Sequence, residues 1–328
     1  MHSARHRRAA AAMTGVLTAA LLAWLPAAPA VARDGGGTPA GGHRDEPALG
    51  AILVNPPTAS LELPFDGVTD SDAERRLTAV AQNRLTTQCM ARYGVTYAPQ
   101  DPPAVSGPED RHRYLFGLAD PAFAAAHGYD STAGTPRPPR PEEPELSEDA
   151  FTALYGHRPA DTPPMLDPLS EEEAREQDSG VPVGGRSVPV GGCLGEGYRT
   201  LYVPKRTSID PLFPFELASE AHARSKADSR TQWVDRQWSR CMTYAGYPGI
   251  ATPYLVVEKL GLGDDLGGPE AIAAAVRDVA CKQRVNLVGF KAAIETAYQE
   301  RVAAEVADDL AAYRVQRATR LALAATLP

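Results

Sequence analysis

The sequence lacks the short patterns by which many enzyme sites are recognised. It contains no G-x-S-x-G, S-x-x-K, H-E-x-x-H or P-loop motif. Aromatic residues are also scarce, with seven Phe and three Trp among 328 residues, and no run of Lys or Arg follows the first few residues. With 30 Pro and 28 Gly, the chain is expected to combine a few packed elements with long irregular stretches.

The N-terminus has the pattern of a secretory signal peptide. Basic residues up to Arg8 precede an apolar run from about Met13 to Leu25, and small residues follow at 30–32. This run is shorter than the ~18–20 apolar residues that span a bilayer. We therefore predict cleavage near residue 32, no transmembrane segment afterwards, and a protein that is secreted or associated with the cell wall.

The charge of the remaining chain argues against one class of partner. Removal of residues 1–32 would leave 30 basic residues against 41 acidic ones, a net charge of about −11. A field of this sign repels polyanions unless a local basic patch opposes it. We expect no nucleic-acid partner.

Export also determines how the cysteines are interpreted. Cys89, Cys193, Cys241 and Cys281 are even in number and have no spacing typical of a zinc site. In an oxidising compartment they predict two disulfides, for which three connectivities exist. We favour Cys241 with Cys281, because a helical hairpin brings the end of one helix near the start of the next; Cys89 with Cys193 follows by elimination.

Composition divides the sequence into five segments. The signal peptide (1–32) precedes a predicted flexible leader (33–68), and a first helix with Cys89 lies within 69–100. Residues 101–190 are Pro-rich, acidic and irregular, and residues 191–328 form a helical core. The predicted fold is mainly α: a disulfide-stapled helical hairpin or bundle with a long Pro-rich irregular excursion.

Capping boxes indicate where two helices begin. Ser71 is followed three residues later by Glu74, which predicts a helix over 72–93, and Ser170 is followed in the same way by Glu173. In each case the hydroxyl and the carboxylate can satisfy two backbone N–H groups of the first turn.

Two long amphipathic stretches predict the core helices, at about 215–245 and 269–325. The second contains an apolar stripe with helical spacing: Ile294, Tyr298, Val302, Val306, Leu310 and Tyr313. Such a stripe needs a partner, most simply the preceding long helix folded back as an antiparallel hairpin.

Three short stretches form recognisable motifs: W-x-x-C-M from Trp238 to Met242, V-N-L-V-G from Val285 to Gly289, and Gly192-Cys193. Together they resemble a group of actinobacterial exported proteins of unassigned function. The resemblance covers about 70–100 and 190–320, and it implies a secreted or lipid-anchored protein. This chain departs from the lipid-anchored members because no lipidation cysteine lies near the predicted cleavage site.

The carboxylates that could take part in chemistry have simpler structural explanations. Glu216 and Glu220, with His222 nearby, could be an acid–base pair, but Glu220 and Arg224 are also an i,i+4 ion pair on a solvated face. The acidic residues from Asp66 to Glu74 lack the glycine and terminal Glu of a calcium loop, and helix capping accounts for most of them. We predict no catalytic residue, metal site or cofactor.

The densest aromatic cluster suggests a binding surface. Trp238 shares a helix face with Met242, which predicts core packing, whereas Trp233 is offset from that face. We predict that Trp233, Tyr247 and Tyr254 line the binding surface, since aromatic side chains stack on sugars and anchor peptides.

These features favour a non-catalytic exported protein that binds an envelope protein or a cell-wall component. Long amphipathic helices can offer a groove to such a partner. The alternative is a secreted hydrolase acting on cell-wall polymer or peptide, whose site is assembled from residues distant in sequence. A third interpretation is a structural wall or spore-coat component, which would be abundant and insoluble.

Overall fold

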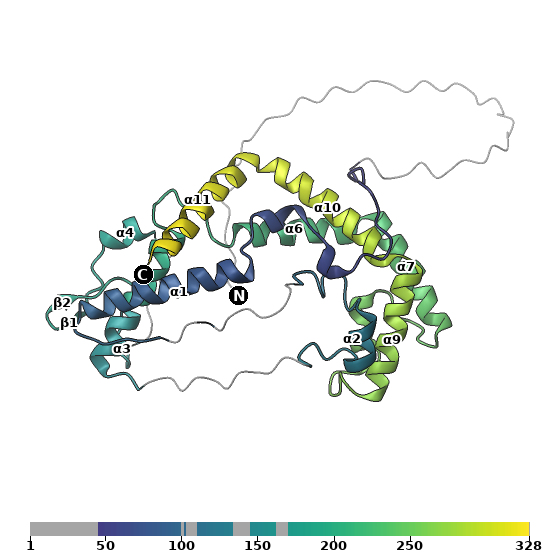
Figure 1. Cartoon of the computed structure of the whole chain (residues 1–328), viewed down its shortest axis with the longest axis horizontal. Coiled ribbons are helices and arrows are strands. Elements are labelled where there is room, and N and C mark those ends of the chain that lie inside the picture. The colour runs from purple at the N-terminus through teal and green to yellow at the C-terminus, as the bar shows by residue number, and fades with distance from the viewer. Residues whose placement is uncertain (1–44, 100–101, 103–109, 134–144, 162–169, 328) are drawn as a thin grey trace, which may run out of the picture. The chain divides into compact units, whose positions relative to one another are not determined.

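A computed structural model describes residues 45–99, 102, 110–133, 145–161 and 170–327 (Figure 1). These residues belong to one compact unit, 43–328. They are mainly helical, with one two-stranded sheet, which confirms the predicted fold class. None of the described helices is long and apolar enough to span a membrane. The predicted signal peptide and parts of the Pro-rich region lie outside the described residues.

The described helices and strands occur in the following chain order. They are η1 (Thr58–Ser60), η2 (Pro64–Gly67), α1 (Asp72–Ala91), α2 (Pro121–His127), α3 (Glu148–Tyr155), α4 (Glu171–Arg175), β1 (Pro182–Val183), β2 (Arg186–Ser187), α5 (Gly192–Tyr202), α6 (Phe213–Ala227), α7 (Ser229–Tyr244), η3 (Pro253–Leu255), α8 (Val256–Lys259), α9 (Pro269–Arg284), α10 (Leu287–Glu305) and α11 (Ala307–Thr326).

Residues 45–68 are part of the packed body, which shortens the leader that we expected. Phe65 and Val68 are buried in the cluster that also contains Tyr298. The η2 turn positions them: the Asp66 carboxylate accepts a hydrogen bond from the Leu63 backbone N–H at 2.8 Å, which fixes the first residues of the turn. The composition of residues 45–68 did not predict that they pack on the body, because this segment is rich in Pro and small side chains.

The first long helix, α1, begins at the predicted capping box. Glu74 N–H donates to Ser71 Oγ at 3.2 Å, and Ser71 N–H donates to the Glu74 carboxylate at 2.8 Å. The preceding Asp70 binds Arg317 at 2.8 Å and Arg320 at 2.6 Å, both from α11. The start of α1 is thereby joined to the C-terminal helix.

The two long amphipathic stretches are divided into shorter helices. The first breaks at Asp228, where the backbone is extended and the carboxylate caps α7 by accepting from Arg230 N–H at 2.8 Å. The second breaks at Asn286, with φ +52°, and at Val306, with φ −128°. Asn tolerates the left-handed region better than other non-glycine residues, which explains the first of these two breaks.

The apolar stripe packs as predicted, although it runs over two helices. Ile294, Tyr298 and Val302 on α10 face α6, and Leu310 and Tyr313 on α11 continue the same cluster. In Figure 1, α10 lies alongside α6 and α7, whereas α11 lies alongside α1. The stripe therefore stays in one cluster across the break at Val306, while the end of α11 packs against α1 through Ala324 and Ala81.

Trp238 is fully buried, as its helix face predicted, and it belongs to a polar network inside the core. Its indole N–H donates to the Asp278 carboxylate at 2.9 Å, and Tyr129 O–H donates to the same carboxylate at 3.2 Å. Lys282 forms an ion pair with Asp278 at 2.9 Å and donates to the Leu118 carbonyl at 2.6 Å. Both charged side chains are only 1% exposed, so each charge must be neutralised by the other. Because Trp238 of α7 donates to the same Asp278 of α9, this ion pair also supports the contact between the two helices.

Both predicted disulfides are present. Cys89 and Cys193 join α1 to α5 with a Cα–Cα distance of 5.5 Å, and Cys241 and Cys281 join α7 to α9 at 5.6 Å. The geometric reason given for the second pair was wrong, since both of its cysteines lie in the last turn of their helices. The bridge therefore links two helix C-terminal ends, and not the end of one helix to the start of the next.

Candidate functional site

The three aromatic residues predicted to form a binding surface do not gather on one cleft. Trp233 is 46% exposed and, with Phe290 and Arg236, lines a cleft of about 460 Å³. Tyr254 instead donates its hydroxyl to the Leu115 carbonyl at 2.7 Å, and burial raises the pKa of that hydroxyl. Tyr247 packs against two apolar core clusters. Of the three, Trp233 lines this cleft, and a binding role for these residues stays a prediction.

The carboxylates considered from the sequence have the structural roles that we favoured. Glu216 and Glu220 are exposed on α6, and Glu220 forms the predicted ion pair with Arg224 at 2.7 Å. The acidic residues from Asp66 to Glu74 serve in capping and ion pairs. Within the described part of the chain, no group of three or more His, Cys, Asp or Glu side chains could hold a metal ion.

A cleft beside the Cys89–Cys193 disulfide is lined largely by charged side chains. Its volume is about 530 Å³, and its walls come from the end of α1, from α4, from β2 and from α5. Six charged residues line it: Arg92, Arg175, Arg186, Arg199, Glu171 and Glu196. Four guanidinium groups therefore face two carboxylates, in a chain whose overall charge is −8.

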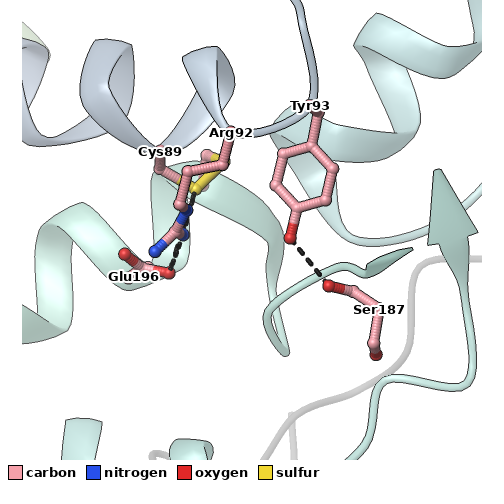
Figure 2. The surroundings of a disulfide bond; sticks show 6 residues. Cys89, Arg92, Tyr93, Ser187 and Glu196 are labelled. Carbon is pink, nitrogen blue, oxygen red and sulfur yellow. Dashed lines mark hydrogen bonds and ion pairs between the residues drawn. A yellow bond between two sulfur atoms is a disulfide. The ribbon is translucent and has the colours of Figure 1, made fainter. Parts of the chain in front are cut away.

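The wall nearest the disulfide is shown in Figure 2. Arg92 caps the C-terminus of α1, and its Nη2 donates to the Glu196 carboxylate on α5 and lies 2.9 Å from Cys89 Sγ. The next residue, Tyr93, donates its hydroxyl to the Ser187 carbonyl at 2.7 Å. Burial lowers the pKa of Arg92, but the adjacent Glu196 more than offsets it, and the net pKa is raised. The guanidinium of Arg92 is thus permanently charged and fixed in place.

Another part of the cleft wall is built around one buried carboxylate, Glu171. Glu171 accepts from Arg199 Nε at 3.1 Å and from Arg175 Nε at 3.0 Å, so each of its oxygens faces one guanidinium. Arg199 is buried, and Gly195 leaves the room that its guanidinium occupies: a Cβ at position 195 would lie 2.8 Å from Arg199 Nη1. Two Arg share one carboxylate here, which leaves an excess of positive charge.

Arg186 completes the cleft from the β1–β2 hairpin. Its Nη1 donates to the Arg92 carbonyl at 2.8 Å, and the residue is exposed. A backbone carbonyl does not neutralise a guanidinium, so Arg186 contributes a full positive charge. Planar guanidinium groups match carboxylate and phosphate oxygens with paired hydrogen bonds. The cleft is suited to holding an anionic group.

The same cleft is poorly suited to acid–base catalysis. No His is among the residues that line it, and both of its carboxylates accept from guanidinium groups. Because guanidinium groups occupy oxygens of both carboxylates, neither is well placed to accept a proton from a substrate.

The cations of this cleft lie far apart in the chain, so no local pattern predicted it. Positions 92, 175, 186 and 199 form no Lys or Arg run, which is the pattern that we sought. One local signal was available: Arg92 follows Cys89 by three residues, and Glu196 follows Cys193 by three. On helices these spacings place both charges beside the disulfide, so the cysteine pairing itself predicts their contact.

The chain has no match among protein-family models, curated proteins or solved structures. The resemblance to the actinobacterial exported proteins stays a prediction from its short motifs.

Proposed function

We propose that this chain is an exported binding protein of the cell envelope, and that its Arg-lined cleft binds a cell-wall polymer carrying carboxylate or phosphate groups. The observation that carries the proposal is the cluster of four guanidinium groups around two carboxylates in an otherwise acidic chain. A local excess of two positive charges attracts an anionic group, while the negative charge elsewhere limits nonspecific binding to polyanions.

Two further observations support this proposal. The Cys89–Cys193 disulfide joins two of the elements that line the cleft, and a preformed cleft loses less entropy on binding. Disulfides also form and persist in oxidising compartments, in agreement with the predicted signal peptide. The envelope is such a compartment and offers abundant anionic polymer.

Titration calorimetry of the purified protein tests the proposal. The probes are poly(glycerol phosphate) and poly-glutamate, with dextran as an uncharged polymer of similar length. We expect binding of at least one anionic polymer, no binding of dextran, and affinity that falls as salt rises from about 50 to 500 mM because exposed charges are screened. Equal binding of dextran, or no binding of either anionic polymer, would contradict the proposal.

Matched variants assign the binding to the cleft. Arg186→Gln removes an exposed cation whose described side-chain contact is the Arg92 carbonyl, so the fold should be retained. We expect about tenfold weaker binding, the loss of one charge-assisted hydrogen bond. Arg284→Gln, an exposed change of the same charge at the end of α9, is the control. If both variants weaken binding equally, net charge and not the cleft is responsible.

A further inference from the structure

A second cleft brings together two histidines that the sequence analysis left unassigned. It has a volume of about 580 Å³, and none of its lining residues belongs to the Arg-lined cleft. His112 comes from the turn at 111–114 and His222 from α6, 110 positions later. Each imidazole is paired with its own carboxylate.

His222 is paired with Glu295, and the carboxylate of this pair is buried. His222 Nδ1 lies 3.0 Å from Glu295 Oε2, and Glu295 also accepts from Ser225 Oγ at 2.7 Å and from Gln299 Nε2 at 3.0 Å. Burial raises the pKa of Glu295, but these hydrogen bonds outweigh burial and the net pKa is lowered.

An ionised carboxylate only accepts hydrogen bonds, so Nδ1 of His222 carries the proton. When the ring is neutral, its Nε2 has the free lone pair. Both residues line the cleft, and with Glu295 1% exposed and His222 28% exposed, the imidazole is the more accessible member of the pair. This is the arrangement by which carboxylates orient catalytic histidines.

The His112 pair has the same design. His112 Nε2 lies 2.9 Å from Asp66 Oδ2, and Asp66 also accepts from the Leu63 backbone N–H at 2.8 Å. Burial raises the pKa of Asp66, whereas the hydrogen bonds from His112 and Leu63 and the charge of Arg111 lower it further than burial raises it. The proton therefore resides on Nε2 of His112, and Nδ1 is the second free position.

One polar connection fixes the two pairs relative to each other. Gln299 donates to Glu295 at 3.0 Å and accepts from the Phe65 backbone N–H at 3.1 Å. Phe65 and Asp66 are consecutive residues of η2, so this turn contains one member of the His112 pair and is joined to the His222 pair through Gln299. The cleft is thus a preorganised arrangement of two oriented histidines.

The remaining walls indicate what the cleft accepts. One part is apolar and consists of Leu63, Phe65, Leu115, Phe215 and Ala218. The charged groups that line the cleft beside the histidines are Asp66, Asp70, Asp72, Asp110, Glu295, Arg75 and Arg111. Asp70 is paired with Arg317 and Arg320 of α11, so four carboxylates remain against two guanidinium groups, which disfavours an anionic ligand. An apolar acyl group and a neutral or cationic remainder fit the cleft better.

We propose that this cleft is a hydrolytic acid–base site for carboxylic esters or amides that carry no negative charge. His222 acts as the general base and His112 as the general acid, each oriented by its carboxylate. The activity is separate from anion binding in the Arg-lined cleft, with which it shares no residue.

The hydrolysis balances with water as the other reactant. His222 Nε2 takes a proton from water while the water oxygen forms a bond to the carbonyl carbon. His112 starts the step with a second proton, taken up from solvent on Nδ1 while Nε2 keeps the proton that it donates to Asp66. It gives the Nδ1 proton to the leaving oxygen or nitrogen as that group's bond to the carbonyl carbon breaks. Solvent then takes the proton from His222 and returns one to His112. Arg111, which also lines the cleft and donates to the Asp66 carbonyl and the Thr69 hydroxyl, contributes a positive charge that favours the transient oxyanion.

The test measures hydrolysis of p-nitrophenyl butyrate, lysine p-nitroanilide and glutamate p-nitroanilide by the purified protein. We expect turnover of the first or second substrate, none of the third, and a bell-shaped dependence of kcat/KM on pH. His222→Ala should lower kcat/KM by about 10²–10⁴-fold, the usual contribution of a general base. Added imidazole should restore part of the rate to this variant.

Controls separate the site from incidental histidine reactivity. His157→Ala removes a histidine that lies outside the cleft and should leave the rate unchanged. Glu295→Gln keeps a side chain of the same size and should lower kcat while binding of anionic polymer stays intact. If His222→Ala does not fold, His112→Ala serves as the test. Absence of turnover, or equal rates in the wild type and the folded histidine variants, would overturn the proposal.

Discussion

At the scale of single residues, buried charges set this protein apart from a simple apolar bundle. Lys282 and Asp278 are paired in the core, and Lys291 binds Asp235 at 2.7 Å nearby. Burial lowers the pKa of both lysines and raises the pKa of both aspartates. Each charge therefore depends on its partner, and removal of one member leaves the other uncompensated in the core.

Replacement of Lys282 tests this dependence. Lys282→Met keeps most of the side-chain volume but leaves the Asp278 carboxylate without its cation, so we expect the free energy of unfolding to fall by about 3–5 kcal/mol. Urea denaturation monitored by circular dichroism measures it. Lys259→Met, at a half-exposed ion pair, should change stability by less than about 1 kcal/mol. Equal effects of the two changes would refute a special role for burial.

The lowered pKa of Glu295 predicts a pH dependence of stability. The ordinary pKa is 4.5, and the folded value is lower. The ionised carboxylate thus contributes its full stabilisation above pH 4.5, and this contribution is lost as pH falls through the folded pKa. We expect the difference in unfolding free energy between the wild type and Glu295→Gln to shrink below pH 4.5. Urea titrations from pH 3 to pH 7 measure it; a difference that grows on acidification would contradict the sign.

At the scale of elements, α3 and α5 approach each other through glycine. Gly192 has φ +69°, and a Cβ there would lie 2.2 Å from the Leu154 carbonyl oxygen. It would also lie 2.6 Å from Gly156 N. No side chain fits at this crossing, so Gly192 permits the packing that places α5, with Glu196 and Arg199, beside the Arg-lined cleft.

A matched pair of alanine variants separates crowding from backbone strain. Gly180 has φ +71° but open space around its Cβ position, so Gly180→Ala should cost about 1 kcal/mol for the left-handed backbone alone. Gly192→Ala adds a clash with backbone atoms and should cost about 3 kcal/mol or more. Thermal unfolding compares them. Similar losses in both variants would show that α3 and α5 separate without penalty.

The two disulfides should differ in their contribution. Cys89–Cys193 spans 104 positions and Cys241–Cys281 spans 40. In the chain-entropy model, the longer loop stabilises by about 5 kcal/mol and the shorter one by about 4 kcal/mol. We expect the double variant C89S/C193S to lose about 1 kcal/mol more than C241S/C281S in denaturant titrations. The opposite order would indicate that the unfolded chain is already compact around the longer loop.

At the scale of the whole molecule, the chain has separate apolar clusters linked by its last two helices. The cluster around Cys89 and Cys193 shares no residue with the cluster around Trp238. The helix α10 packs against α6 and α7, and α11 packs against α1 and α5. The protein can therefore loosen in one cluster while the other stays packed.

Hydrogen exchange tests this independence. In C89S/C193S we expect faster amide exchange in α3, α5 and the β1–β2 hairpin, whose cluster contains this disulfide. The amides of α7, α9 and α10 should keep their wild-type protection. Mass spectrometry of peptic peptides resolves these segments. Uniform loss of protection along the chain would show that the clusters unfold as one unit.

The sequence alone determined the local features of this protein. The capping boxes at Ser71 and Ser170, the burial of Trp238, the Glu220–Arg224 pair and the mainly helical class all follow from contacts within a few positions. Both cysteine pairs were also predicted. The expected hairpin was wrong for Cys241 and Cys281, which join the C-terminal ends of α7 and α9.

Tertiary structure alone decided the two clefts. Arg92 and Arg199 face one cleft, and His112 and His222 face the other, through contacts between segments about 100 positions apart. No local spacing encodes such contacts, because they depend on where each helix breaks and which partner its apolar face then meets. The composition of the chain therefore predicts helices and disulfides, whereas the sites arise only when the packed helices bring distant charges together.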